Sequence, residues 1–343
     1  MRWFLRVLIA LGLLIIVAVV GLYMGTSGSH VVLDTVATDP KLPAIEVDGV
    51  RLHAEAFGDP SRPVVIVLHG GPGNDYRMLE SLQALADDFY VVFYDQRGAG
   101  LSARVPGAQL TVDGYVGELE GVRRHFAGDR AVHLVGHSWG AMLAAAYLTR
   151  HPSQVTSAVL AEPGFLDDAA MRAFMAASNG MRPELSSALI RQVVVSAFEA
   201  LHVDGPDADA RMDYFTMRLM SDPDIEGNPM AGYFCHRSMR NASLKMWRLG
   251  STAMFSAQEN VDADGHLKTP ILGGQPYAGP VLFVASECNT LIGEPFQRVQ
   301  MKHFPTARIE VVEGAGHTMF GERPEVTTAL VRRFLTETST TAR

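Results

Sequence analysis

One serine in this sequence lies in a setting suited to nucleophilic catalysis. Ser138 is the centre of Gly136-His137-Ser138-Trp139-Gly140, a G-x-S-x-G pentapeptide. An apolar, strand-like run (131–135) precedes it and a helical pattern (139–150) follows it. A nucleophilic serine needs this setting, because a tight turn between strand and helix, with flanking glycines, projects the hydroxyl above the sheet. We predict that Ser138 is a nucleophile; the alternative is an ordinary strand–helix turn.

A histidine is the usual base for such a serine, whose hydroxyl is a poor nucleophile until its proton is taken. His317 lies in VVEGAGHTMF, a loop that directly follows the last strand-like run. Its place downstream of Ser138, at the end of a strand, predicts that it is the base. Other late histidines fall in helical patterns or in a long insertion: His202, His236, His266 and His303.

The negative charge that develops on an attacked carbonyl needs two backbone N–H donors. One is predicted to be that of Trp139, the residue after the nucleophile. The other should come from His69-Gly70-Gly71-Pro72-Gly73, a loop that follows a strand-like run and whose glycines allow close approach to a substrate. Gly71 is the predicted donor.

Strand-like and helical patterns alternate along most of the chain. Six apolar, β-branched runs are predicted to be strands of a mostly parallel sheet: 64–70, 90–98, 131–138, 156–164, 280–287 and 307–314. Helical patterns follow them at 75–86, 113–126, 139–150, 295–303 and 324–336. Such alternation predicts an α/β fold with a doubly wound sheet.

The alternation is interrupted once, and this interruption defines the predicted domains. Residues 165–275 contain helix-like stretches rich in Met and Ala and no strong strand, which predicts a helical cap inserted between the strand-like runs 156–164 and 280–287. The core is then 44–164 and 276–343, preceded by a tether at 26–43 and a membrane anchor or signal segment at 1–25. Methionines at helical spacing in the cap are either core residues or the lining of an apolar pocket.

The N-terminus carries a membrane signal. Arg2 and Arg6 precede an uncharged run, 7–24, whose 18 residues would rise about 27 Å as a helix, close to the thickness of a bilayer core. A cleaved signal peptide has a shorter apolar region, of about 7–15 residues. We therefore expect an uncleaved single-pass anchor, with a signal peptide as the alternative. The arginines predict that the catalytic domain lies on the non-cytoplasmic side.

Composition limits the other classes of function. The chain of 343 residues has 48% hydrophobic and 19% charged residues and a formal net charge of −8, so a phosphate-binding basic surface is not expected. No Cys/His spacing typical of a metal site is present. Cys235 and Cys288 could form a disulfide in an oxidising compartment, but two buried thiols are the favoured interpretation.

Three motifs together resemble a known family: HGGPG (69–73), DQRGAGLS (95–102) and GHSWG (136–140). The combination is similar to the proline iminopeptidase branch of the α/β-hydrolases, and the match covers the core. This resemblance implies a Ser–His–acid triad, a helical cap and no cofactor. It also implies cap carboxylates that hold the free N-terminus of a substrate, for which Asp222, Asp224 and Glu226 are candidates.

The sequence departs from this family where the acid of the triad is expected. Asn289 occupies the place of the usual aspartate, and an amide cannot compensate the charge of an imidazolium. Glu162, which ends the preceding strand 24 residues after Ser138, is the predicted replacement, as in haloalkane dehalogenases and similar relatives. Glu287 is the second candidate, and Glu162 could instead form an ion pair with a cap arginine. Asp95 is interpreted as structural, pinning loops through Arg97.

These residues predict acyl transfer on an ester or amide of a small substrate, through an acyl-enzyme. Dehalogenase and epoxide hydrolase chemistry would require an aspartate at position 138. A proline iminopeptidase-like aminopeptidase is the alternative enzyme. A non-catalytic binding protein on a hydrolase scaffold is the alternative of another class, favoured by the missing aspartate at 289.

Overall fold

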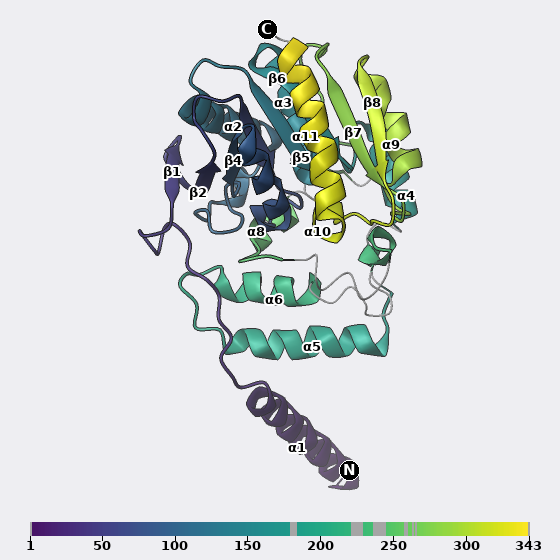
Figure 1. The fold of residues 1–343 in the computed structure, drawn as a ribbon. Coiled ribbons are helices and arrows are strands. Elements are labelled where there is room, and N and C mark those ends of the chain that lie inside the picture. The colour runs from purple at the N-terminus through teal and green to yellow at the C-terminus, as the bar shows by residue number, and fades with distance from the viewer. Residues whose placement is uncertain are drawn as a thin grey trace.

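A single eight-stranded sheet forms the centre of the molecule (Figure 1). The structure is a computed structural model and describes residues 2–178, 184–220, 229–235, 245–256, 260–262, 264 and 266–341. The strand order is β1-β2-β4-β3-β5-β6-β7-β8. The strands are β1 (Ala44–Val47), β2 (Val50–Phe57), β3 (Val64–Leu68), β4 (Tyr90–Tyr94), β5 (Val132–His137), β6 (Val155–Ala161), β7 (Val281–Ser286) and β8 (Ala307–Val312).

Strands β3 to β8 are parallel, as the sequence predicts. The first two strands were not predicted, and they pair antiparallel at one edge. Their hairpin turn contains Asp48 and Gly49, which have φ values of 49° and 78°. Such positive φ values at both turn residues are typical of a tight hairpin, and Asp-Gly is a favoured pair there. The sequence analysis missed this local signal.

Alternate residues of the buried strands point to the two faces of the sheet, and helices cover both faces. In β3, Val64, Ile66 and Leu68 pack on the side of α2 (Val112–Ala127) and α3 (Trp139–Arg150). Val65 and Val67 pack on the side of the 3₁₀ helix η1 (Tyr76–Asp87) and α11 (Pro324–Thr341). This two-sided burial explains why the strands appear as continuous apolar runs.

The chain between β6 and β7 is called the cap below. Its described elements are α4 (Asp168–Ala177), α5 (Ser187–Leu201), α6 (Ala210–Met220), η5 (Pro229–Tyr233) and α8 (Ser251–Ser256). Helices α5 and α6 lie together beyond one end of the sheet (Figure 1). A buried ion pair anchors α6 to the core, since Asp213 contacts both Arg104 and Arg248 at 2.9 Å.

The two cysteines form a disulfide, so the interpretation that favoured free thiols was wrong. Cys235 and Cys288 are bonded, with their Cα atoms 4.9 Å apart. The bond joins the segment after η5 to the loop after β7. Their separation of 53 residues gave no sign of this proximity, because it depends on how the cap folds back onto the core.

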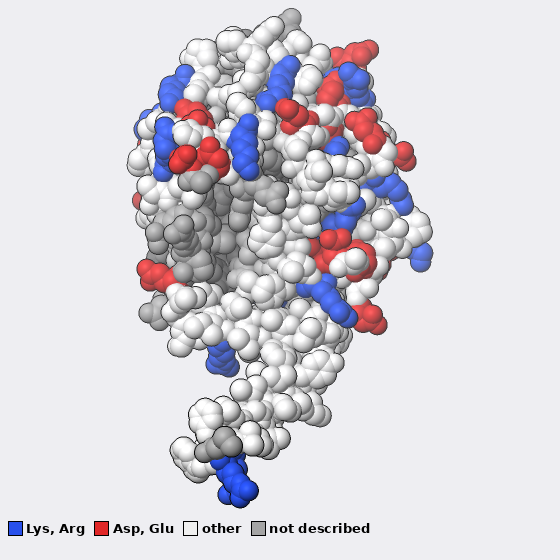
Figure 2. Space-filling model, turned by 180° about the vertical axis from the view of Figure 1, so that it is seen from behind, with Lys and Arg blue, Asp and Glu red and all other residues white. Residues whose placement is uncertain are grey.

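The N-terminal helix α1 (Arg2–Gly25) projects from the cap end of the molecule, and no residue of it is buried (Figures 1 and 2). It is long and apolar enough to cross a membrane, with a mean hydropathy of 2.9, and a signal sequence has the same properties. Residues 26–43 contain no helix or strand, but they do not hang free. Val36 is fully buried and its N–H donates to Leu101 O at 2.8 Å, so this segment packs against the core.

Candidate active site

Three of the predicted site residues lie just beyond the cap-side ends of parallel strands in the same half of the sheet. Ser138 follows β5, Glu162 follows β6, and His317 lies in the loop after β8. The carboxyl ends of parallel strands share one edge of a sheet, which is why residues far apart in sequence converge there. Ser138 and Glu162 are also held side by side through the backbone, because Ser138 N–H donates to Ala161 O at 2.8 Å.

Ser138 occupies a strained turn between β5 and α3. Its φ of 54° and ψ of −118° are rare for a residue with a side chain. Flanking glycines make this turn possible: a Cβ at Gly140 would lie 2.1 Å from Leu68 O, and one at Gly136 would lie 2.3 Å from Gly140 O. Within the described part of the chain the Ser138 hydroxyl has no hydrogen-bond partner. The side chain is half-buried, so the hydroxyl is free to meet a substrate.

His317 and Glu162 form a close pair. His317 Nδ1 lies 2.7 Å from Glu162 Oε2, and the glutamate side chain is fully buried. Glu162 has a φ of 45°, a second positive value at the same edge of the sheet. A carboxylate at this distance orients the imidazole through Nδ1–H and compensates an imidazolium charge, leaving Nε2 for proton transfer.

The carboxylate oxygens of Glu162 accept hydrogen bonds from two further residues, a pairing that the sequence did not predict. Ser286 donates its backbone N–H (2.7 Å) and its hydroxyl (2.6 Å) to Oε1. Asn289 donates its amide N–H to Oε2 at 2.7 Å. Asn289 therefore contacts the carboxylate of Glu162 and not the histidine. These donors reduce the free-energy cost of burying the charge.

Glu287, the second candidate acid, points elsewhere. Its side chain is exposed and accepts a hydrogen bond from Gly314 N–H at 2.8 Å. Among the described residues, the carboxylate oxygens of Glu162 contact Ser286, Asn289 and His317 and no cap arginine.

Two aromatic rings pack against His317. The ring of Tyr233, in η5 of the cap, stacks on it with centroids 4.5 Å apart. The ring of His137 lies 4.6 Å away, and its Nε2 is 2.7 Å from His317 O. Burial, and secondarily the charge of His317, lowers the pKa of His137 to about 3. His137 is therefore neutral near pH 7, and its Nε2–H donates to that carbonyl.

The loop that carries Gly71 approaches Ser138 from β3. Gly71 has a φ of 45°, and a Cβ there would lie 2.9 Å from the Asn74 side chain. Trp139 is the first residue of α3, so its N–H has no partner inside the helix. Gly71 N–H, on the loop after β3, and Trp139 N–H, at the start of α3, are thus the two predicted donors.

Gln96, which the sequence analysis did not single out, ties these loops together. Its side chain donates to His69 O at 3.1 Å and accepts from Trp139 Nε1–H at 2.8 Å. Its backbone N–H donates to His69 Nε2 at 3.0 Å. One glutamine of the DQRG motif therefore joins the HGGPG and GHSWG motifs.

The structural interpretation of Asp95 needs correction in one respect. Arg97 does not hold it: Arg97 pairs instead with the buried Glu118 at 2.8 Å. Asp95 accepts hydrogen bonds from Tyr76 N–H (3.0 Å) and Leu101 N–H (2.8 Å) and lies 2.9 Å from His53 Nδ1. It therefore pins the loops mainly through backbone donors.

A second buried carboxylate, Asp75, joins the cap to the core. It accepts hydrogen bonds from Trp247 N–H (2.5 Å) and Arg248 N–H (3.2 Å) of the cap. Burial, reinforced by the nearby charge of Asp95, raises the pKa of Asp75 well above its usual range. Since Asp75 follows the HGGPG loop by two residues, the cap is fixed to the loop that carries Gly71.

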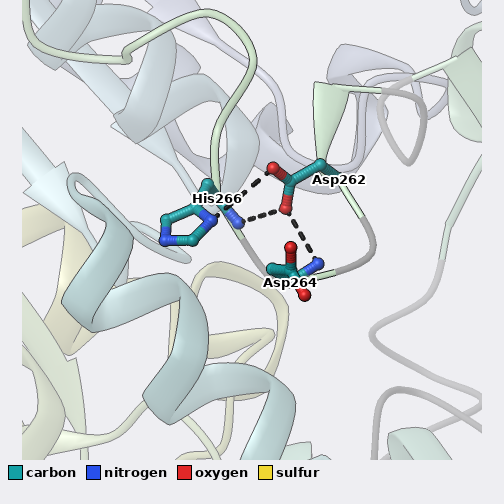
Figure 3. Close-up of side chains that lie close together, drawn as sticks. All are labelled: Asp262, Asp264 and His266. Atoms are coloured by element: carbon teal, nitrogen blue, oxygen red, sulfur yellow. Dashed lines mark hydrogen bonds and ion pairs between the residues drawn. The ribbon is translucent and has the colours of Figure 1, made fainter.

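One cluster has the residue types of a metal site. Asp262, Asp264 and His266 place ligand atoms within 4.8 Å of one another, and all three are exposed (Figure 3). Asp262 Oδ1 already accepts the backbone N–H groups of Asp264 (3.0 Å) and His266 (2.8 Å). These bonds are those of a turn, so we assign the cluster a role in local structure.

The predicted amine-binding carboxylates, Asp222, Asp224 and Glu226, lie outside the described residues.

Comparison with known proteins identifies the family to which this fold belongs. The alpha/beta hydrolase fold family matches residues 63–324, and the chain belongs to this family. A proline iminopeptidase from Heyndrickxia coagulans is 29% identical over 85% of this chain and 97% of its own length. The chain is thus an α/β-hydrolase similar to proline iminopeptidases.

Solved structures share the fold. A proline iminopeptidase-related protein from Thermus thermophilus aligns with a TM-score of 0.61 at 24% identity, over 86% of this chain and 97% of its own. A membrane phospholipase A described as a bacterial virulence factor aligns with a TM-score of 0.57 at 18% identity, over 97% and 99%.

Proposed function

We propose that this protein is a membrane-anchored serine hydrolase that cleaves an ester or amide bond through Ser138, His317 and Glu162. The contact between His317 Nδ1 and Glu162 Oε2, at 2.7 Å, carries the proposal. Through this contact Glu162 provides the carboxylate that an asparagine at position 289 cannot provide. The missing aspartate at 289 is therefore no longer an argument for a non-catalytic binding protein.

The proposed reaction has two steps. His317 Nε2 takes the proton of Ser138 Oγ as this oxygen attacks the substrate carbonyl carbon, and Gly71 N–H and Trp139 N–H bind the oxyanion. The protonated imidazole then gives its proton to the leaving amine or alcohol. Water attacks the acyl-enzyme with His317 again as base, which releases the acid and restores the serine.

The imidazolium in these steps is stabilised by the glutamate. Glu162 is itself held by Ser286 and Asn289, so it need not reorient when charge appears on His317. Preorganised charge of this kind costs no rearrangement during the reaction.

A proline iminopeptidase-like activity is the second candidate, and the similarity to the Heyndrickxia coagulans enzyme over nearly its whole length favours it. Such an enzyme needs a negatively charged subsite for the substrate's free amine. A general esterase or amidase needs an apolar acyl pocket instead.

A hydrolysis screen of the full chain in detergent tests the proposal. Prolyl arylamides, with free or acetylated amines, should be compared with p-nitrophenyl esters of increasing acyl length, with Ser138→Ala as the control. Hydrolysis of either set that is lost in the control supports a serine hydrolase. If the prolyl arylamides are cleaved only when their amine is free, the aminopeptidase activity is favoured over the esterase or amidase activity. Equal rates in the wild type and the control would refute the proposal.

For location, we propose that α1 remains as a single-pass anchor with the hydrolase on the non-cytoplasmic side. Arg2 and Arg6 at its start, the uncharged run that follows and the paired cysteines support this orientation. Extraction at alkaline pH tests it: an anchored chain stays with the membrane fraction, and a chain processed by signal peptidase is released.

A further inference from the structure

Helix α5 of the cap has an exposed apolar face. Its packed side contains Ser196 and Ala200, which are buried. On an exposed side of the helix, Ile190, Val194, Ala197 and Leu201 follow one another at the spacing of one helical face. Ile190 is 50% exposed, Val194 37% and Leu201 52%. We call these four residues the α5 face.

Helix α5 lies at the end of the molecule from which α1 leaves (Figure 1). His202, the C-cap of α5, has its Nε2 2.8 Å from Tyr23 O in the last turn of α1. The rings of Tyr23 and His202 are also in contact, with centroids 4.2 Å apart. The C-terminal end of the apolar helix is therefore attached to the C-terminal end of α5.

The chain that follows α1 is held at several points. His30 Nδ1 is 2.9 Å from Tyr214 OH in α6, and Arg248 donates to Leu33 O at 2.9 Å. Val32 packs against an apolar cluster that includes Ala200 and Tyr214. These contacts hold the segment after α1 against the cap, so α1 ends close to α5. A bilayer around α1 would therefore lie next to α5.

We propose that the α5 face rests in the interfacial layer of the bilayer that α1 spans, so that the cap sits on the membrane. This inference depends on the proposed anchor and not on the proposed chemistry. An amphipathic helix in this layer buries its apolar side at the boundary between headgroups and acyl chains. Arg191, exposed beside the face, can extend its guanidinium to lipid phosphates while its stem stays in the apolar layer.

The surface around α1 agrees with this placement. In Figure 2 the cap end is mostly white, whereas blue and red side chains gather on the opposite part of the molecule. Exposed apolar patches on a soluble surface usually mark an interaction site. A second protein would have to enter the space between the cap and the lipid, which the short connection to α1 restricts, so the bilayer is the favoured occupant.

A membrane-resting cap has a consequence for substrate access. Ser138, Glu162 and His317 lie at the strand ends that face the cap (Figure 1). The site would then lie on the side of the core that faces the membrane, where substrates that partition into lipid, such as hydrophobic esters and amides, are concentrated.

Spin labels on the full chain in lipid nanodiscs test the proposal. The two native cysteines are paired, so an introduced cysteine is the free thiol available for labelling. Labels at Val194→Cys and Leu201→Cys report on the α5 face. Val17→Cys in α1 is the control for insertion, and Val299→Cys, 61% exposed on α9 (Glu294–Gln300) of the core, is the matched exposed control.

The readout is the ratio of collision rates with oxygen, which dissolves in lipid, and with a water-soluble nickel chelate. We expect this ratio to be several-fold higher at positions 194 and 201 than at 299. A high ratio at 17 with a water-like ratio at both 194 and 201 would overturn the inference while leaving the anchor intact. A low ratio at 17 would refute the anchor as well. A third outcome is that neither reagent reaches the labels at 194 and 201 and that their spectra are broadened by nearby labels. This would identify a second copy of the chain as the occupant of the α5 face and would also overturn the inference.

Discussion

His317 Nδ1 lies 2.7 Å from Glu162 Oε2, although 155 residues of sequence separate the two. In this chain the carboxylate beside the histidine comes from the end of β6, while Ser286 at the end of β7 and Asn289 in the loop after it donate to this carboxylate. The acid of the proposed triad thus follows β6, and the position after β7 where the family resemblance implies an aspartate holds an asparagine that donates to it.

Replacing Glu162 with Gln should lower kcat about 10³- to 10⁴-fold, because an amide cannot stabilise the imidazolium and can favour the wrong tautomer of His317. Steady-state kinetics on an ester substrate measure the effect, and thermal unfolding shows whether the fold is retained. Glu287→Gln is the matched control and should change kcat less than about twofold, since its carboxylate only accepts from Gly314 N–H at the surface. The reverse ranking would remove Glu162 from the triad.

Replacing Asn289 with Asp should also impair the enzyme, although it restores the residue type found in the family. Asn289 Nδ2 is 2.7 Å from Glu162 Oε2, so a second carboxylate would repel the first and raise the pKa of one of them. We expect kcat at pH 7 to fall about 10-fold or more and to recover partly at lower pH, where one carboxyl group is protonated.

The exchanged pair Glu162→Gln/Asn289→Asp provides the matching test. It restores one carboxylate and one amide, so its kcat should exceed that of Glu162→Gln alone. Double-mutant kinetics measure this coupling. Strictly additive losses would show that the two side chains do not act as a unit.

Replacing Gly71 with Ala should lower kcat by about 10²- to 10³-fold, the usual loss for a missing oxyanion donor. Its φ of 45° is unfavourable for alanine, and the new Cβ would lie 2.9 Å from the Asn74 side chain, so the loop must move. KM should change less than kcat, because the donor acts on the transition state. Gly117→Ala, in α2 with nothing within 4 Å of its Cβ, is the control and should leave both constants unchanged.

Local patterns were sufficient to predict the strand, turn and helix around Ser138 that the structure shows. Ser138 and Trp139 follow from a pentapeptide in a strand–helix setting, and the parallel strands follow from continuous apolar runs that only two-sided burial explains. Glu162 was preferred over Glu287 because of its position at a strand end, and this is the carboxylate that the structure places beside His317.

The other features of the site depend on contacts between side chains that are far apart in the sequence. No local pattern in the sequence indicates such contacts. Asn289 was recognised as a departure, but its bond to Glu162 spans 127 residues. Gln96 belongs to a recognised motif, yet its contacts with His69 and Trp139 appear only when three loops meet. The pairing of Cys235 with Cys288 likewise required the path of the cap.

His137 should make the protein sensitive to acid. Its pKa is about 3 in the folded protein, where burial disfavours the charged form, against 6.5 for a histidine side chain in water. The unfolded state therefore binds more protons between these values, and the free energy of unfolding falls as the pH drops from about 6.5 towards 3, by several kcal/mol if nothing compensates.

Urea unfolding at several pH values measures this dependence. His137→Gln can keep an N–H donor for His317 O without titrating, so it should reduce the slope of stability against pH in this window. An unchanged slope in the variant would assign the acid sensitivity to other groups.

The central claim is that His317 and Glu162 activate Ser138, and covalent labelling with a fluorophosphonate tests it most directly. Intact mass spectrometry of the full chain after labelling at neutral pH should show one adduct per molecule, located on Ser138 by peptide mapping. Ser138→Ala should not react, and Glu162→Gln should react much more slowly than Glu287→Gln. A wild-type protein that stays unlabelled, or an adduct that persists in Ser138→Ala, would contradict the account.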